Sequence, residues 1–449
     1  MPRTNAPSER RLQELWARRE ASSSPLATED GRAMRVLFPG WPNHDSGPDF
    51  RGAIVQDENG QVARGDVELH LTPSGWRQHG HHRDAAYSKV ILHVVWKTAK
   101  DPRSRREAPA PTVVFAPALL EGGAPSPRPI EGDPRPCVHH ADSWDDGRMG
   151  VLLDAEGDAR FIEKASLFAA SVEAHGEEPA LFTALCEALG YAKNIEPFRL
   201  LAERMPLGRL RSIAMSRPEE ERRAVMEGLL FGAAGLLPSQ RALEADGYAA
   251  QLEAVWRAHG DAERAGPLPW RRFRIRPENG PGRRIAAAAR IVERCAESGL
   301  VPGIETPLRE AIAMETSRPL AGSLTISDDG YWASHIDFDT TCAAAPSLLG
   351  KSRASEIVVN VVLPFFFVVA RSRHDAALAE GCRRLYAAQA PLAENHITQR
   401  MEGLLLPGRA RTIVTGARRQ QGLIGLYKGR CFELKCDGCV FAAARSAEG

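Results

Sequence analysis

The first part of the chain, up to about residue 116, consists of short apolar runs separated by polar and glycine-rich segments. Runs of this length that are rich in Val, Ile, Leu and Phe are typical of β-strands. We therefore predict strands at 34–38, 50–57, 62–71, 90–96 and 112–115. Asn59-Gly60, between the second and third of these runs, is the strongest short-range signal for a β-hairpin.

Two segments of the same region show a helical pattern instead. Leu12, Leu15 and Trp16 recur at the i, i+3, i+4 spacing of an amphipathic helix over residues 8–20, with Ser8 as its N-cap. Residues 74–87 predict a short helix or helical turn. The predicted order is therefore helix, three strands, short helix and two strands, which defines an α/β domain over residues 1–119.

Beyond about residue 150 the apolar positions change to helical spacing. We predict helices at 161–174, 180–189, 197–204, 219–234 and 242–259, with Gly190, Gly235 and Gly260 as natural stops. A linker rich in Pro, Gly and Asp precedes them at 120–147. We therefore expect a helical domain over 148–319 and a mixed, mainly helical region over 320–449 that ends in a cysteine-bearing tail.

Composition and charge narrow the classes of protein that the chain can belong to. The 449 residues include 58 basic and 57 acidic side chains, so no global field attracts a polyanion, and any nucleic-acid binding must come from local patches.

The N-terminus lacks the apolar core of a secretory signal, and the apolar run 357–370, interrupted by Asn360, is too short to span a bilayer. Eight Cys in such a chain indicate thiols or metal ligands rather than disulfides. We expect a cytoplasmic protein without membrane association, and no feature indicates a particular protein partner.

Acidic side chains gather on two adjacent predicted strands. Asp66, Glu68 and His70 share one strand face because side chains alternate along a strand, and Asp49 enters at the start of the preceding strand. Carboxylates on neighbouring strands suit Mg²⁺ or Mn²⁺, and such an ion activates water against a phosphodiester. A structural polar network at the same residues is the alternative.

This pattern resembles the PD-(D/E)XK nuclease superfamily. Pro48-Asp49 and Glu68-Leu69-His70 match its motif, except that His70 stands where the superfamily has a Lys that orients or activates water. The resemblance implies a restriction-endonuclease-like α-β-β-β-α-β core, with Asp49 and Glu68 as metal ligands and catalytic residues together with His70. It also implies that Glu9 or Glu14 of the first helix can supply a further metal-binding acid.

Histidines are frequent just after the predicted strand 62–71, which carries Asp66, Glu68 and His70. His79 and His82 lie one helical turn apart, so we expect one of them to reach the site, whereas Asp84 and Tyr87 cap and pack the turn. His81 and His93 fit either a metal ligand or a hydrogen-bonded core group.

The C-terminal tail carries cysteines at metal-ligand spacing. Cys431-x4-Cys436-x2-Cys439 suits a zinc site or a 4Fe–4S cluster, for which a fourth ligand is needed. Cys382, Cys342, Cys137 or a His can fill that place, and reduced thiols without metal are the alternative.

An arginine-rich stretch follows the predicted helices. Arg271, Arg272, Arg274 and Arg276 are interleaved with Trp270 and Phe273, which is typical of a surface that clamps phosphates and stacks a base. The alternative is that these arginines pair with nearby acidic helices and that the aromatic rings are core.

The whole chain also resembles a bacterial family known as domain of unknown function 2851. The matching segments include Gly47-Pro48-Asp49-Phe50, Gly65-Asp66-Val67-Glu68-Leu69-His70, His79 to Tyr87, Val90 to Val94, Glu196-Pro197-Phe198, Leu229 to Leu237, Arg274 to Asn279, and the terminal cysteines. No activity is assigned to this family, so the resemblance implies none for this chain. The leading hypothesis is a metal-dependent nuclease. The alternatives are a non-catalytic nucleic-acid-binding or scaffolding protein with a degenerate nuclease core, and a metal-dependent hydrolase of another substrate that uses the His-rich turn.

Overall fold

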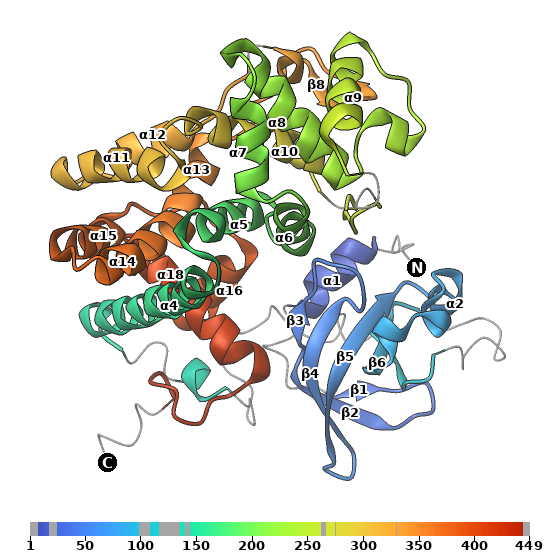
Figure 1. The fold of residues 1–449 in the computed structure, drawn as a ribbon. Coiled ribbons are helices and arrows are strands. Elements are labelled where there is room, and N and C mark those ends of the chain that lie inside the picture. The colour runs from blue at the N-terminus through green and yellow to red at the C-terminus, as the bar shows by residue number, and fades with distance from the viewer. Residues whose placement is uncertain are drawn as a thin grey trace. The chain divides into compact units, whose positions relative to one another are not determined.

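The structure is a computed structural model that describes residues 8–17, 25–97, 108–115, 135–139, 144–261, 266–273, 275–328 and 330–442. Contacts divide the chain into two compact units (Figure 1). The sheet unit holds residues 1–149, 399–410 and 424–449, and the helical unit holds residues 150–398 and 411–423. A mixed β-sheet region is thus followed by a largely helical one, as predicted. The predicted boundaries at 119, 147 and 319 stay predictions, since the compact units are not continuous segments.

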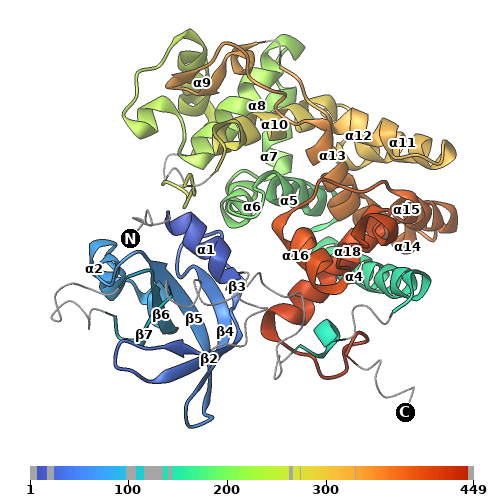
Figure 2. The same cartoon turned by 180° about the vertical axis from the view of Figure 1, so that it is seen from behind.

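The sheet unit is built on one seven-stranded mixed sheet. Its strands run in the order β1-β2-β4-β5-β6-β7, and β3 pairs with β4. Their bounds are β1 Leu26–Ala27, β2 Ala33–Phe38, β3 Trp41–Pro42, β4 Phe50–Asp57, β5 Val62–His70, β6 Val90–Val95 and β7 Thr112–Val114. Figure 2 shows β7 beside β6 at one side of the sheet. The predicted strands are therefore confirmed.

The direction of the strands changes at β5. β4 and β5 form the predicted antiparallel hairpin, whose turn places Gly60 at a φ of 80°. β5 and β6 are parallel, and the connection between them holds α2 (Gly75–Gln78) and the 3-10 turns η2 (His81–Arg83) and η3 (Ala85–Tyr87). A parallel pair needs such a crossover, which is present as predicted. Five strands precede it where three were predicted, because the short β1 and β3 were not expected.

Alternation along β5 separates an apolar face from a polar one. Val67 and Leu69 pack with Leu92 and Val94 of β6 in the core beneath α1 (Glu9–Ala17), which contributes the fully buried Leu12 and Trp16. Trp16 satisfies its indole by donating to the Pro39 carbonyl at 3.0 Å. Glu68 and His70, of opposite parity, face the other way.

The sheet curls until its outer strands approach one another. A backbone bridge joins Thr28, just after β1, to Val113 of β7, and the Glu29 N–H donates to the Thr112 carbonyl at 2.8 Å. This region is therefore nearly closed, which removes most of the exposed edge that an open sheet leaves.

C-terminal residues complete the outer surface of the sheet unit. Trp41 packs edge-on against Tyr427 with ring centroids 5.1 Å apart, and Phe432 and Leu434 join the same apolar cluster as Phe38. Arg64 of β5 donates to the Glu433 carbonyl at 3.0 Å. The cysteine-bearing tail is thus part of the sheet unit.

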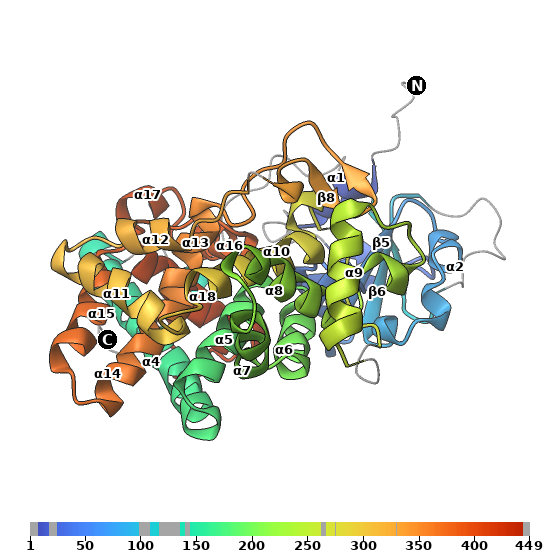
Figure 3. The ribbon, with the colours of Figure 1, turned by 45° about the horizontal axis from the view of Figure 1, so that its top comes forward.

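Helices make up nearly all of the second unit, and Figure 3 shows α8, α9 and α10 side by side. The helices beyond the sheet strands are α4 Asp146–His175, α5 Glu177–Leu189, α6 Ile195–Arg204, α7 Leu207–Met215, α8 Glu219–Ala234, α9 Gly247–His259, α10 Pro281–Arg294, α11 Leu300–Ala313, α12 Arg318–Leu324, α13 Lys351–Ile357, α14 Leu363–Ser372, α15 Ala376–Ala388, α16 His396–Leu405, α17 Ala410–Ile413 and α18 Ala417–Gly429. Gly190, Gly235 and Gly260 cap α5, α8 and α9, as predicted. The sequence pattern missed α7 and the small hairpin of β8 (His335–Asp337) and β9 (Thr340–Thr341).

The apolar run 357–370 belongs to one continuous helix, Lys351–Ser372, with a π-helical segment at Val358–Val362. By length and composition this helix could cross a membrane, but most of it is buried inside the helical unit. Asn360 within it donates to the Glu356 carbonyl at 2.8 Å and accepts from Lys164, so the half-buried amide is satisfied.

Two glycines allow α4 and α18 to pack backbone to backbone. A Cβ on Gly157 would clash with the Arg418 carbonyl oxygen, and one on Gly422 with the Leu153 carbonyl oxygen. We expect Gly157→Ala to lower the free energy of unfolding by about 2 kcal/mol, the usual cost of overpacking. Urea denaturation followed by circular dichroism measures this.

Gly322→Ala is the matched control, because nothing lies within 4 Å of the added Cβ on the exposed face of α12. It should raise stability by about 0.5–1 kcal/mol through the unfolded state. Equal effects of the two substitutions would contradict the close packing.

Candidate metal centre

Asp49 and Glu68 lie side by side at the junction of β4 and β5. The Asp49 backbone N–H donates to Glu68 Oε2 at 3.0 Å, and the Leu69 N–H donates to Asp49 Oδ2 at 3.0 Å. Gln13 of α1 donates to Asp49 Oδ1 at 2.6 Å. The antiparallel register, which pairs Phe50 with Val67, puts the two acids on adjacent strands, so the sequence-predicted pair is brought together.

Burial gives the Glu68 carboxyl an unusual affinity for its proton. Its pKa is raised to about 9, first by loss of hydration and then by the neighbouring charge of Asp49, with a smaller contribution from Glu9. The hydrogen bond from the Asp49 N–H opposes this shift. A buried carboxyl whose pKa is raised by a neighbouring acid is a candidate ligand for a cation.

Two imidazoles, those of His70 and His81, lie beside the other oxygen of Glu68. Ligand nitrogens of His70, His79 and His81 all lie within 4.8 Å of one another, and this is the metal-competent group found among the described residues. Glu68 Oε1 lies 3.0 Å from His81 Nε2 and 3.6 Å from His70 Nε2. His81 Nε2 is buried and makes no hydrogen bond despite this proximity. Three imidazoles and one carboxylate suit zinc, iron or manganese better than magnesium.

Hydrogen bonds behind the group fix the ring of His70. His70 Nδ1 lies 2.9 Å from His93 Nε2, and His93 Nδ1 lies 3.4 Å from the Thr112 hydroxyl. His70 Nε2 therefore faces His79 Nδ1 at 3.1 Å. A second group that orients a ligating imidazole is the usual arrangement at metal sites.

The sequence folds this way locally because glycine and aromatic residues allow a tight turn over β5. A Cβ on Gly75 would lie 2.5 Å from the His70 ring, so only glycine lets α2 approach so closely. Gly80, at a φ of 78°, separates His79 from His81 and turns both toward the strand. Tyr87 stacks on His81 with centroids 3.8 Å apart.

Two histidines of the group, His70 and His81, are neutral near pH 7. Burial, followed by neighbouring imidazoles, lowers the pKa of His70 to about 2 and that of His81 to about 4. Burial likewise lowers the pKa of His93 to about 4. Neutral imidazole is the form that binds a metal.

Other polar residues of this region have structural roles. Asp66 accepts from the Gly52 N–H at 3.0 Å and holds an irregularity in the ladder, and Asp84 caps η3 as predicted. His82 is exposed. The prediction that His79 or His82 reaches the site therefore holds for His79. For His81 the sequence left a metal ligand and a core group open, and the structure places its ring nitrogen in the group with His70 and His79.

The predicted arginine surface lies in the helical unit. Arg271 and Arg276 are exposed, Arg272 pairs with Asp337 at 3.0 Å, and Arg274 lies outside the described residues. Trp270 donates to the Ala234 carbonyl and packs on Phe198 as a core residue.

The remaining candidate ligands are the cysteines, none of which forms a disulfide in the described chain. Cys382 is buried in the core of the helical unit, whereas Cys342 lies near β9. Cys431, Cys436 and Cys439 line one small cavity together with Cys137. No three cysteine sulfurs of the described residues lie as close together as the histidine nitrogens do.

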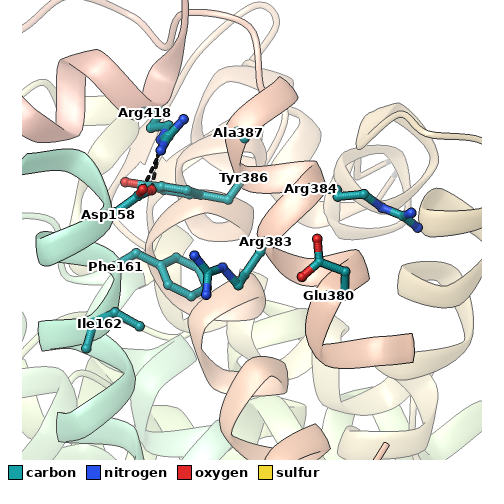
Figure 4. A pocket seen from close by; sticks show the side chains of 9 residues that line it. All are labelled: Asp158, Phe161, Ile162, Glu380, Arg383, Arg384, Tyr386, Ala387 and Arg418. Atoms are coloured by element: carbon teal, nitrogen blue, oxygen red, sulfur yellow. Dashed lines mark hydrogen bonds and ion pairs between the residues drawn. The ribbon is translucent and has the colours of Figure 1, made fainter. Parts of the chain in front are cut away.

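A separate pocket opens on the helical unit between α4, α15 and α18 (Figure 4). Arg418 and Asp158 pair at one end, while Arg384 points away from them. Its charged residues are mostly exposed or already paired, so it offers no catalytic arrangement comparable to the histidine group.

Comparison with known proteins identifies the family of the chain, but it gives no biochemical activity for that family. The profile of the family described as "Protein of unknown function (DUF2851)" matches residues 9–396. The chain belongs to the DUF2851 family. No curated protein and no solved structure matches the chain. The match includes Asp49, Glu68 and the histidine group, whereas the C-terminal cysteines lie beyond it.

Removing a ligating imidazole should weaken metal binding in this DUF2851 protein. We expect His79→Ala and His81→Ala to lower the affinity for Zn²⁺ and Mn²⁺ by about 100-fold or more, since each loses a bond to the ion. Isothermal titration calorimetry measures this. His82→Ala is the control and should bind as the natural chain does; equal losses in all three variants would contradict the assignment.

Metal binding should also depend on pH through Glu68. The ion must displace the proton of a carboxyl whose pKa is about 9, so apparent affinity falls as pH falls below that value. From pH 7 to 8.5 the Mn²⁺ affinity should rise roughly 20-fold for one displaced proton. Glu68→Gln should bind more weakly, with little pH dependence over this range. A natural chain whose affinity is flat over this range would show that the Glu68 proton is not displaced.

Proposed function

We propose that this DUF2851 protein is a metal-dependent phosphodiesterase of the nuclease type. The observation that carries the proposal is the position of the Glu68 carboxylate: one oxygen lies beside the His70 and His81 nitrogens, which form a group with His79, and the other accepts from the Asp49 N–H. Such a group holds a cation next to an acidic, partly buried surface, as hydrolysis of a phosphodiester requires.

The bound ion would supply Lewis acidity and lower the pKa of a coordinated water. The residues of the chain would bind this ion and position its ligands. His70, His79, His81 and Glu68 hold the ion, and Asp49 positions Glu68 through its backbone N–H. Glu9 lies close enough to add negative charge at the same place.

His70 acts in this proposal as a ligand and not as a substitute for the superfamily's lysine. It is 1% exposed, its Nδ1 is committed to His93, and its pKa of about 2 keeps it uncharged. A neutral, buried imidazole cannot supply the positive charge of a lysine. The ion would supply that charge instead.

Two observations favour a nucleic acid as the substrate. The strands β2, β4 and β5 between α1 and the crossover, with β5 and β6 parallel, support the α-β-β-β-α-β core that the resemblance implies, to which the short β1 and β3 are additional. Asp49 precedes β4, and Glu68 lies in β5. In the helical unit, Arg271 and Arg276 are exposed next to Phe273, which is 70% exposed. Arginines beside an exposed aromatic ring are typical of single-strand binding.

Incubation of the full chain with single- and double-stranded DNA and RNA, in the presence of Mn²⁺, Mg²⁺ or Zn²⁺, tests the proposal. We expect cleavage that Asp49→Asn, Glu68→Gln and His79→Ala each reduce by about 100-fold or more, while His82→Ala retains it. Fluorescence anisotropy should show that the inactive variants still bind the oligonucleotide.

The non-catalytic alternative gives a different result. A chain that binds both metal and nucleic acid but cleaves nothing with any of the three ions would favour a binding or scaffolding role. Cleavage of a small phosphodiester or another ester, with no nucleic-acid binding, would favour a hydrolase of another substrate.

A further inference from the structure

The sheet unit holds a second group of metal-competent side chains, separate from the histidines. Cys137, from the 3-10 turn at Pro136–His139, lines the same small cavity as Cys431, Cys436 and Cys439 of the tail. These segments lie almost three hundred residues apart along the chain, so only the fold identifies Cys137 as the companion of the C-terminal triplet.

The four cysteines line one cavity whose other charged residues are basic. Arg135, Arg430 and Lys435 also line the cavity, and no Asp or Glu is among the described residues that do. Leu404 and Leu434 form apolar walls.

We propose that Cys137, Cys431, Cys436 and Cys439 ligate a 4Fe–4S cluster. Four thiolates in a partly apolar cavity with cationic neighbours are the ligand set for such a cluster, whose net charge is negative. The cluster would join the 135–139 segment to the tail within the sheet unit.

The sulfurs of the described residues are not at the spacing that a single zinc ion requires. Tetrahedral zinc, with Zn–S bonds of about 2.3 Å, brings its four sulfurs to about 3.8 Å from one another. Among the described residues no three cysteine sulfurs lie within 4.8 Å of one another. A four-iron cluster is larger than a single ion and holds its ligands farther apart.

Anaerobic purification of the full chain, followed by iron and acid-labile sulfide analysis and visible spectroscopy, tests the proposal. We expect a brown protein with about four iron and four sulfide per chain. Cys137→Ser and Cys431→Ser should lose the iron, the sulfide and the visible absorption, and their thermal unfolding midpoint should fall.

Two controls separate this outcome from misfolding and from the histidine site. Cys342→Ser, in the helical unit, should keep the cluster, and so should His79→Ala. Zn²⁺ binding at the histidine site of Cys137→Ser should be unchanged if the sheet unit is folded.

Three results would overturn the proposal. They are a chain that holds neither iron nor sulfide after anaerobic reconstitution, four thiols that hold zinc alone, or a Cys137→Ser variant with full cluster content. None of them bears on nuclease activity, which depends on other residues.

Discussion

A buried carboxylate that lacks a basic partner is the constraint on which the site depends. Glu68 is 5% exposed, and the ion pairs of the described residues give it neutral imidazoles but no Lys or Arg. An ionised carboxylate in such a place is costly unless it is paired or coordinates a metal. The chain keeps Glu68 there, beside His70 and His81, which burial holds uncharged. A bound cation would offset the cost of ionising Glu68 at this place.

This constraint explains why β5 is the central element of the sheet unit. Its odd-numbered residues, Val67 and Leu69, form the core with β6 and α1, so the even-numbered Glu68 and His70 must face the turn that follows. Gly75 then lets that turn approach the His70 ring, and Gly80 lets His79 and His81 bend inward. A single strand thus anchors the hydrophobic core on one side and the candidate chemistry on the other.

The sheet unit is also completed by residues from the far end of the chain. Tyr427 and Phe432 cover Trp41 and Phe38, and the same tail carries the cysteines that meet Cys137. A metal cluster at this place would add to the apolar contacts that already hold the tail in the sheet unit. The two candidate centres therefore have different chemistry: imidazole and carboxylate for hydrolysis, thiolate for holding the chain together.

The sequence by itself determined the strands, most of the helices and the candidate acids. Alternation and the Asn59-Gly60 turn predict the hairpin because these signals are local, and Gly190, Gly235 and Gly260 end their helices for the same reason. The Asp49 and Glu68 pair was also predictable, since it follows from two neighbouring strands. Only the tertiary structure decided that His81 joins His70 and His79, that Asp66 bonds to a backbone N–H, and that Cys137 is the cysteine nearest the tail. These facts depend on how a turn folds back over a strand and on contacts between distant segments, neither of which has a signature in local periodicity.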